Sequence, residues 1–248
     1  MRRRSLITAA SLAAAVPFLP RPTLAQAASI VGGGAVSPRQ AYEKWAELAQ
    51  AALGIRMTYQ GSNSNTGADQ VVARQVDFAG TDNPKRPGML REQSLIQFPS
   101  VLNAYVPVVN LPGVQANQLK LTGELLADIY LGKITKWNDA KLAALNPGLK
   151  LPNLAVAPIH RADSSGTTLL TTTYLSRTSD AWRTGPRAGS VVKWPAVGKA
   201  GNLNAGVAEA VKATQGAIGY VTEAGEVAKG LAVAQLRNQS GKFVKPDG

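Results

Sequence analysis

The chain has 248 residues, of which 45% are hydrophobic, one is histidine and none is cysteine. This length allows one large domain or two smaller ones, and the lack of cysteine excludes both a disulfide framework and a lipid-modified cysteine. The formal charge of +12 favours anionic partners through long-range attraction. The basic residues are dispersed and do not interleave with aromatic residues, which argues against nucleic acid as that partner.

Residues 1–27 have the pattern of a secretory signal peptide. Arg2, Arg3 and Arg4 precede an apolar stretch over residues 6–19 that is too short to span a membrane, and Ala25 and Ala27 form a small-x-small cleavage site. We predict cleavage after Ala27 and export to a bacterial periplasm or beyond the cell. An ordinary signal and a twin-arginine signal both remain open.

The first half of the exported chain alternates between expected strands and helices. A glycine-rich loop over residues 32–38 leads into a helix that Ser37 caps and Gly54 ends. A polar loop over residues 60–67 leads into a second helix. The expected strands are residues 29–31, 55–59, 76–84, 95–101 and 104–109.

The second half continues the alternation. An amphipathic helix is expected over residues 122–131, and a later helix is expected to begin at a cap formed by Asn204. Further strands are expected at 154–159, 216–221 and 233–236, further helices at 169–175 and 222–229, surface loops at 188–195 and 198–202, and a frayed polar end at 238–248. Strands that alternate with helices define an α/β fold with mainly parallel sheet.

One stretch has the composition of an anion site. Arg161, Asp163, Ser165, Gly166 and Thr167 lie between an expected strand and an expected helix. Free N–H groups at a helix start attract anions, and the arginine fork suits an oxyanion. A plain helix cap is the alternative explanation of this turn taken alone.

Two other helix starts also follow strands, near Ser37 and near Ser64. Ligands of open α/β sheets bind at such strand ends, so three converging starts would surround one small anion with N–H donors. His160 is the only histidine, and strand alternation directs it to the face opposite Arg161. We therefore assign His160 a structural role rather than a catalytic one.

Eight segments together resemble the periplasmic phosphate-binding protein of the bacterial ABC-type phosphate importer. They keep their order over nearly all of the exported chain and are residues 42–45, 59–61, 76–82, 128–137, 145–152, 161–168, 190–195 and 216–221. The resemblance implies a two-lobed periplasmic-binding-protein-like fold of class II type. It divides the chain into a signal peptide (1–27), a first lobe (28–104), a second lobe (105–237) and a polar tail (238–248).

The resemblance also implies a phosphate site. Its residues would be Ser64, Asp82, Arg161, Ser165, Gly166 and Thr167, with Val36 and Ser37 in the first loop and Asp163 holding Arg161 in position. A carboxylate only accepts hydrogen bonds, so Asp82 would take the proton of phosphate and reject sulfate, which has none. The chain departs from the family at Val36, where a threonine is usual, and in the loop around Ser64, which has fewer glycines. Weaker affinity or a related oxyanion such as arsenate is then possible.

Members of this family continue well past the position of Gly248. Their final segment completes the first lobe, so we expect that lobe to be incomplete here and to expose apolar surface and an unpaired sheet edge. A fragment, a truncated product and a shortened relative with different packing remain open.

By this resemblance the chain binds inorganic phosphate as a monomer, without cofactor or metal, and delivers it to an ABC permease and ATPase complex. The first alternative is a phosphate or arsenate scavenger, a sensor, or a non-functional truncated remnant. The second is a phosphate-ester hydrolase, although one histidine and no cysteine argue against a transition-metal site, and there is no G-x-S-x-G motif.

Overall fold

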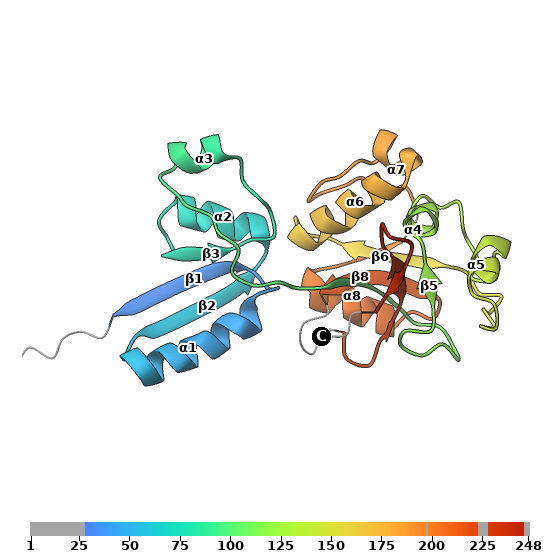
Figure 1. Cartoon of the computed structure of the whole chain (residues 1–248), viewed down its shortest axis with the longest axis horizontal. Coiled ribbons are helices and arrows are strands. Elements are labelled where there is room, and N and C mark those ends of the chain that lie inside the picture. Colours follow the sequence, from blue (N-terminus) through green and yellow to red (C-terminus); the bar gives the residue numbers. More distant parts are fainter. Residues whose placement is uncertain (1–27, 197, 223–227, 246–248) are drawn as a thin grey trace, which may run out of the picture.

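The computed structural model describes residues 28–245, apart from residue 197 and residues 223–227. The expected signal peptide and most of the expected helix at 222–229 lie outside the described residues. The described elements form two α/β lobes, and the segment after α3 crosses from the first lobe to β4 in the second (Figure 1). The boundaries at residues 104 and 237 stay predictions.

The first lobe is built on a parallel sheet. Its elements are β1 (Ser29–Ala35), α1 (Arg39–Leu53), β2 (Arg56–Ser62), α2 (Ser64–Val72), β3 (Phe78–Gly80) and α3 (Pro87–Glu92). The strand order is β2-β1-β3, with both neighbours of β1 parallel to it. Parallel crossovers are right-handed, so α1 and α2 cover opposite faces of this sheet.

The glycine-rich stretch that was expected to be a loop belongs instead to β1. A side chain at Gly32 would meet the ring of Phe78, and one at Gly34 would lie 2.3 Å from the Gly80 carbonyl oxygen. Glycine is therefore required here because the neighbouring strand and its aromatic side chain approach closely. The prediction of a loop was wrong because sequence alone does not distinguish this use of glycine from a turn.

The helix ends of the first lobe differ in part from expectation. Gly54 ends α1 in the left-handed conformation, with φ of 67°, as expected. Ser37 does not cap α1, because its hydroxyl donates to Asp82 instead. Residues 95–101 form no strand but part of the crossing segment, so that prediction was wrong.

The second lobe combines parallel and antiparallel pairing. Its elements are β4 (Tyr105–Val109), β5 (Lys120–Leu121), α4 (Gly123–Tyr130), α5 (Ala140–Leu145), β6 (Ala157–Arg161), α6 (Gly166–Thr178), α7 (Asp180–Thr184), β7 (Lys199–Gly201), α8 (Leu203–Lys212), β8 (Ala217–Thr222), β9 (Ala232–Val233), β10 (Gln235–Arg237) and β11 (Phe243–Val244). The main sheet has the order β7-β6-β8-β4-β9 among the described residues. Its β7, β6 and β8 are parallel, whereas β4 is antiparallel to both β8 and β9.

Short elements account for most of the differences in this lobe. Part of the expected loop at 198–202 is the edge strand β7, and the expected strand at 233–236 is divided between β9 and β10. The polar end is not frayed over its described part, because β11 pairs antiparallel with β10. Such two- and three-residue strands carry too few side chains to show a period in the sequence.

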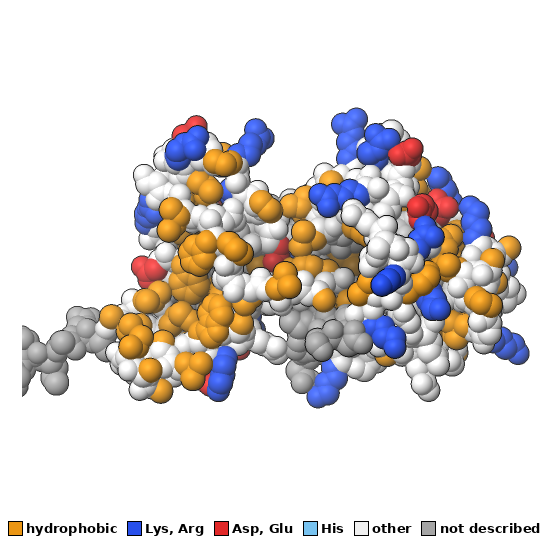
Figure 2. Space-filling view, viewed as in Figure 1, with side chains coloured by type: hydrophobic (Ala, Val, Ile, Leu, Met, Phe, Trp, Pro, Cys, Tyr) orange, Lys and Arg blue, Asp and Glu red, His pale blue; other side chains and the backbone are white. Residues whose placement is uncertain are grey.

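Among the described residues, the two clusters of buried hydrophobic side chains lie in the second lobe, from residue 106 onward. The first lobe relies on an aromatic group in which Tyr42 contacts Trp45, Tyr59 and Phe78. Trp45 remains 44% exposed and Leu53 71% exposed, and hydrophobic side chains are prominent on the first lobe in Figure 2. None of the described helices is long and apolar enough to cross a membrane.

Candidate anion-binding site

A small polar cavity lies between the two lobes. Its walls come from the ends of β1 and β2, the loop after β3, the end of β6 and the start of α6. Its volume is about 10 Å³, close to the room that one water molecule needs. The lobes are thus nearly closed on each other, and an oxyanion larger than water needs them to separate slightly.

All eight residues that the sequence singled out for the site line this cavity. They are Val36, Ser37, Ser64, Asp82, Arg161, Ser165, Gly166 and Thr167. The hydroxyl-bearing residues among them are at most 5% exposed. The structure therefore brings together residues from three strand–helix connections, as the expected convergence of helix starts requires.

Arg161 is buried and held from several sides. Its guanidinium donates from Nε and Nη2 to the two carboxylate oxygens of Asp163, and from Nη1 to Asn204 Oδ1 at 3.0 Å. Burial on its own raises the pKa of Asp163, but the hydrogen bonds and charge of Arg161 and the Leu203 N–H outweigh it and hold that pKa below its usual value. Asp163 thus stays ionised and fixes the arginine with its positive charge at the cavity.

Asp82 lies on the first-lobe side of the cavity with both carboxylate oxygens engaged. Ser37 Oγ donates to Oδ1 at 2.7 Å, and Ser64 Oγ donates to Oδ2 at 3.2 Å. The Asp82 N–H donates in turn to Ser64 Oγ at 3.1 Å. The two serines therefore fix the orientation of an acceptor-only group opposite Arg161.

The start of α6 supplies backbone donors. Ser165 caps the helix by accepting from the Thr168 N–H at 3.3 Å. The N–H groups of Gly166 and Thr167, in the first turn, have no partner within the helix and lie at its positive end. With Arg161 beside them, this wall of the cavity favours a negative charge.

The two lobes meet closely around Gly166. A side chain at this glycine would lie 2.4 Å from Ser64 Oγ and 2.5 Å from Asp82 Cβ. Nearby, Asn65 Nδ2 donates across the cleft to the Ser164 and Ser190 hydroxyls. Asn65 thus joins the two lobes. From the sequence, we noted only that this loop around Ser64 has fewer glycines than is usual in the family.

Sequence reasoning missed three residues beside this site. Asn204 was expected to cap α8, but it lies inside that helix, fully buried, and accepts from Arg161. Tyr220 accepts from the Arg161 N–H at 3.1 Å and shares a hydrogen bond with Thr168, and burial raises its pKa to about 12. Tyr105 is the third, and burial followed by the charge of Asp82 raises its pKa.

Only long-range contacts reveal these three residues, since no local motif marks them. The ring of His160 stacks on Trp194 at a centroid distance of 5.0 Å. Within the described part of the chain, no three His, Cys, Asp or Glu residues gather in a way that could hold a metal ion.

The fold agrees with the family comparison. Residues 20–247 match the family model of the PBP superfamily domain, and the chain belongs to that superfamily. The phosphate-binding protein PstS of Haemophilus influenzae is 46% identical over 222 residues, which cover 90% of this chain and 66% of that relative. PstS of Methanocaldococcus jannaschii is 36% identical and covers 86% of this chain and 58% of the relative.

The chain thus spans about two thirds or less of the length of these curated relatives. Among solved structures, a phosphate-binding protein from Stenotrophomonas maltophilia aligns with a TM-score of 0.66 at 21% identity, over 85% of this chain and 65% of that one. A putative phosphate ABC transporter substrate-binding protein from Clostridium perfringens aligns with a TM-score of 0.62 at 16% identity, over 88% and 84%. These alignments establish the two-lobed fold.

Proposed function

We propose that this chain binds inorganic phosphate between its lobes. The observation that carries the proposal is the placement of an acceptor, Asp82, opposite a fixed cation, Arg161, across a cavity that also presents backbone N–H groups. Curated relatives with up to 46% identity are named phosphate-binding proteins, which supports this ligand over other oxyanions.

The two walls have different chemical tasks. Arg161 and the first turn of α6 attract the charge of the ligand, which any oxyanion carries. Asp82 selects for a proton, because phosphate at neutral pH donates one to the carboxylate whereas sulfate brings only negative charge against it. Arsenate also carries a proton, so the site is expected to accept it.

The proposed biological role is import. We propose that the chain is exported to the periplasm, loses its signal peptide near Ala27 and passes phosphate to an ABC permease and ATPase complex. The names of the relatives support this role, and so does the start of the sequence, where a basic segment precedes an apolar one.

Calorimetric titration of the exported chain with phosphate, sulfate and arsenate tests the binding proposal. We expect phosphate and arsenate to bind with similar affinity and sulfate to bind at least a hundredfold more weakly. Equal affinity for sulfate and phosphate would contradict the proposed role of Asp82 in selecting a protonated anion. No heat and no thermal stabilisation with any of the three anions would contradict the proposed site itself.

A further inference from the structure

Asn204 contacts the cation of the proposed site without lining the cavity itself. It lies in the first turn of α8, is fully buried, and its Oδ1 accepts from Arg161 Nη1 at 3.0 Å. An arginine only donates hydrogen bonds, so Oδ1 rather than Nδ2 must face it. Nδ2 has no hydrogen-bond partner among the described residues. Because a buried donor without a partner is costly, asparagine is an unexpected residue here on grounds of stability alone.

The guanidinium of Arg161 has more donors than its two fixed partners use. Of its five N–H groups, Asp163 takes one on Nε and one on Nη2, and Asn204 takes one on Nη1. One N–H on each η nitrogen remains, and within the described part of the chain Nη1 makes one further, weak contact with Thr167 Oγ1 at 3.5 Å. The two acceptors therefore leave the end of the guanidinium for two oxygens of an oxyanion in the cavity.

Two formal negative charges already lie near the single positive charge of this site. Asp163 pairs with Arg161, and Asp82 lies on the opposite wall of the cavity, so the three side chains together carry one net negative charge. An aspartate at position 204 would have nearly the shape of asparagine, would pair with Arg161 and would leave no donor without a partner. It would also add a third negative charge beside the ligand. Asparagine meets the same geometric need without that charge.

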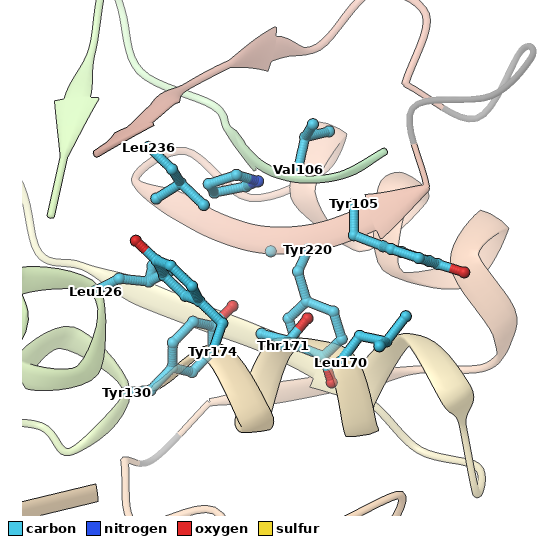
Figure 3. Close-up of a pocket in the computed structure, with 11 residues that line it drawn as sticks. Tyr105, Val106, Leu126, Tyr130, Leu170, Thr171, Tyr174, Tyr220 and Leu236 are labelled. Atoms are coloured by element: carbon cyan, nitrogen blue, oxygen red, sulfur yellow. The ribbon is translucent and has the colours of Figure 1, made fainter. Parts of the chain in front are cut away.

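The elements packed against α8 are β4, β6, β7 and β8. Tyr105 of β4 and Tyr220 of β8 line an apolar pocket of about 220 Å³, whose lining residues carry no formal charge (Figure 3). Burial raises the pKa of both tyrosines, that of Tyr220 to about 12. Both therefore stay neutral near pH 7, and neither competes with a ligand for the charge of Arg161.

The other titratable groups on and around α8 have partners of their own or face solvent. Lys199 of β7 is exposed and donates beyond the end of α8, and His160 of β6 stacks on Trp194. Glu209 and Lys212, on α8 itself, are exposed. The wild type and any variant of position 204 share all of these groups, so their titration cancels when the two are compared.

We propose that Asn204 sets the charge of the anion that this site accepts. This inference rests on the proposed phosphate site. The amide oxygen holds Arg161 at the cavity without adding a negative charge, so the site takes doubly charged phosphate as well as the singly charged form. Both forms carry a proton for Asp82. Asp82 thus recognises a proton, whereas Asn204, a positioning residue that acts through Arg161, determines how much total charge is accepted.

Asn204→Asp tests this inference through the pH dependence of phosphate affinity. Phosphate changes from mainly singly charged to mainly doubly charged between pH 6 and pH 8, and repulsion by the new carboxylate grows in proportion to the charge of the ligand. We expect calorimetry to show an affinity about tenfold below that of the wild type at pH 6 and about a hundredfold below it at pH 8. Equal losses at both pH values would overturn the inference, because a purely structural defect acts equally on both forms.

Asn202→Asp is the matched control, because Asn202 is exposed two positions earlier and water and salt screen its new charge. Its affinity should stay within twofold of the wild type at both pH values. Asp163→Asn combined with Asn204→Asp returns one carboxylate and one amide to Arg161, in exchanged positions. We expect this double variant to recover the pH dependence of the wild type and to have a higher Tm than Asp163→Asn alone.

The double variant also gives the answer where Asn204→Asp shows no cooperative unfolding. Phosphate binding by the double variant with the pH dependence of the wild type supports the inference. Loss of folding or of phosphate binding in the double variant overturns it, because the amide is then required at position 204 for structure, and binding by the wild type leaves the proposed function intact. A wild-type chain that binds no phosphate at either pH overturns the proposed function and this inference together.

Discussion

At the scale of single residues, the proposed site assigns attraction of charge to Arg161 and recognition of a proton to Asp82. Arg161 lies in β6 of the second lobe and Asp82 follows β3 of the first, so a ligand of the proposed site would contact both residues only when the lobes meet. Each side chain is fixed before a ligand arrives, Arg161 by Asp163 and Asp82 by two serines. Such prior fixation reduces the entropy that binding must remove.

Asp82→Asn tests proton recognition directly. An amide presents N–H donors in place of a negative charge, so a deprotonated oxyanion is no longer repelled. We expect the ratio of phosphate to sulfate affinity to fall by at least tenfold, measured by titration with each anion. Asp69→Asn, at an exposed position in α2, should leave the ratio unchanged. An unaltered ratio in Asp82→Asn would show that selectivity arises elsewhere.

Asp163 gives the fold an acid-sensitive contribution. Its folded pKa is lower than that of an unfolded aspartate, about 3.9, so its stabilisation is complete above that value and is lost as the pH falls through the folded pKa. Asp163→Asn leaves the Arg161 charge buried and should lower the free energy of unfolding at pH 7 by about 2–3 kcal/mol.

Thermal unfolding from pH 7 to pH 2 checks this contribution. The difference in Tm between wild type and Asp163→Asn should shrink as the pH falls below about 4, because the wild-type carboxylate then becomes protonated. Asp180→Asn removes an exposed ion pair with Arg183 and should have almost no effect. A Tm difference that stays constant down to pH 2 would contradict the role assigned to Asp163.

The candidate site residues could be predicted because they lie in short local motifs. The residues that hold them in place, such as Asn204, could not be predicted. Arg161, Ser165 and Thr167 belong to one strand–turn–helix connection whose residue types already indicate an anion. Asn204 comes from a helix 43 positions later, and its contact with Arg161 depends on how α8 packs beside β6. Its position near a helix start favoured a cap on local grounds, and tertiary packing decided otherwise.

At the scale of elements, the start of α6 forms part of the second-lobe wall of the cavity. Gly166→Ala adds a methyl group that would overlap Ser64 and Asp82, so the lobes would have to remain farther apart. We expect phosphate affinity to fall at least tenfold while Tm in the absence of phosphate changes by only a few degrees. Calorimetry and thermal unfolding of the same sample measure the two effects.

Gly88→Ala is the control for this prediction. Gly88 lies in α3, and a side chain there meets no atom within 4 Å, so alanine should preserve the affinity and slightly favour the helix. Undiminished phosphate affinity in Gly166→Ala would mean that the phosphate-bound protein keeps its lobes farther apart at Gly166 than they are in this structure.

Elements with many buried apolar side chains followed the sequence pattern, whereas the glycine-rich strand β1 and the shortest strands did not. Helix α4 buries Leu126, Ile129 and Tyr130 at helical spacing, and β4 is a continuous apolar run that is buried from Val106 to Val109. Strand β1 could not be recognised as a strand over its glycines, because these glycines allow close packing against Phe78 and Gly80. Strand β7 forms only by pairing with β6, a contact between residues about 40 positions apart that no local pattern records.

At the scale of the whole molecule, Asn65 joins the lobes. Its amide donates to Ser164 and Ser190 in the second lobe, while its oxygen accepts from Asn83 in the first. Asn65→Ala removes these interlobe hydrogen bonds and should weaken phosphate binding about three- to tenfold, mainly through faster release. Stopped-flow measurement of phosphate release checks this.

Thr66→Ala is the neighbouring control, since Thr66 is exposed in the same helix. Its release rate should match that of the wild type. A release rate in Asn65→Ala equal to that of Thr66→Ala would show that the interlobe hydrogen bonds do not hold the closed state.

The unequal distribution of buried residues has a consequence for local unfolding of the two lobes. Both apolar cores belong to the second lobe, so backbone amides there should exchange with solvent only in rare, large openings, while those of the first lobe exchange in frequent local ones. A ligand that bridges the lobes would then slow exchange chiefly in β1, α1 and β2. Ordering the first lobe would then offset part of the binding free energy. Mutations in that lobe would therefore change affinity even where the mutated residue does not contact the ligand.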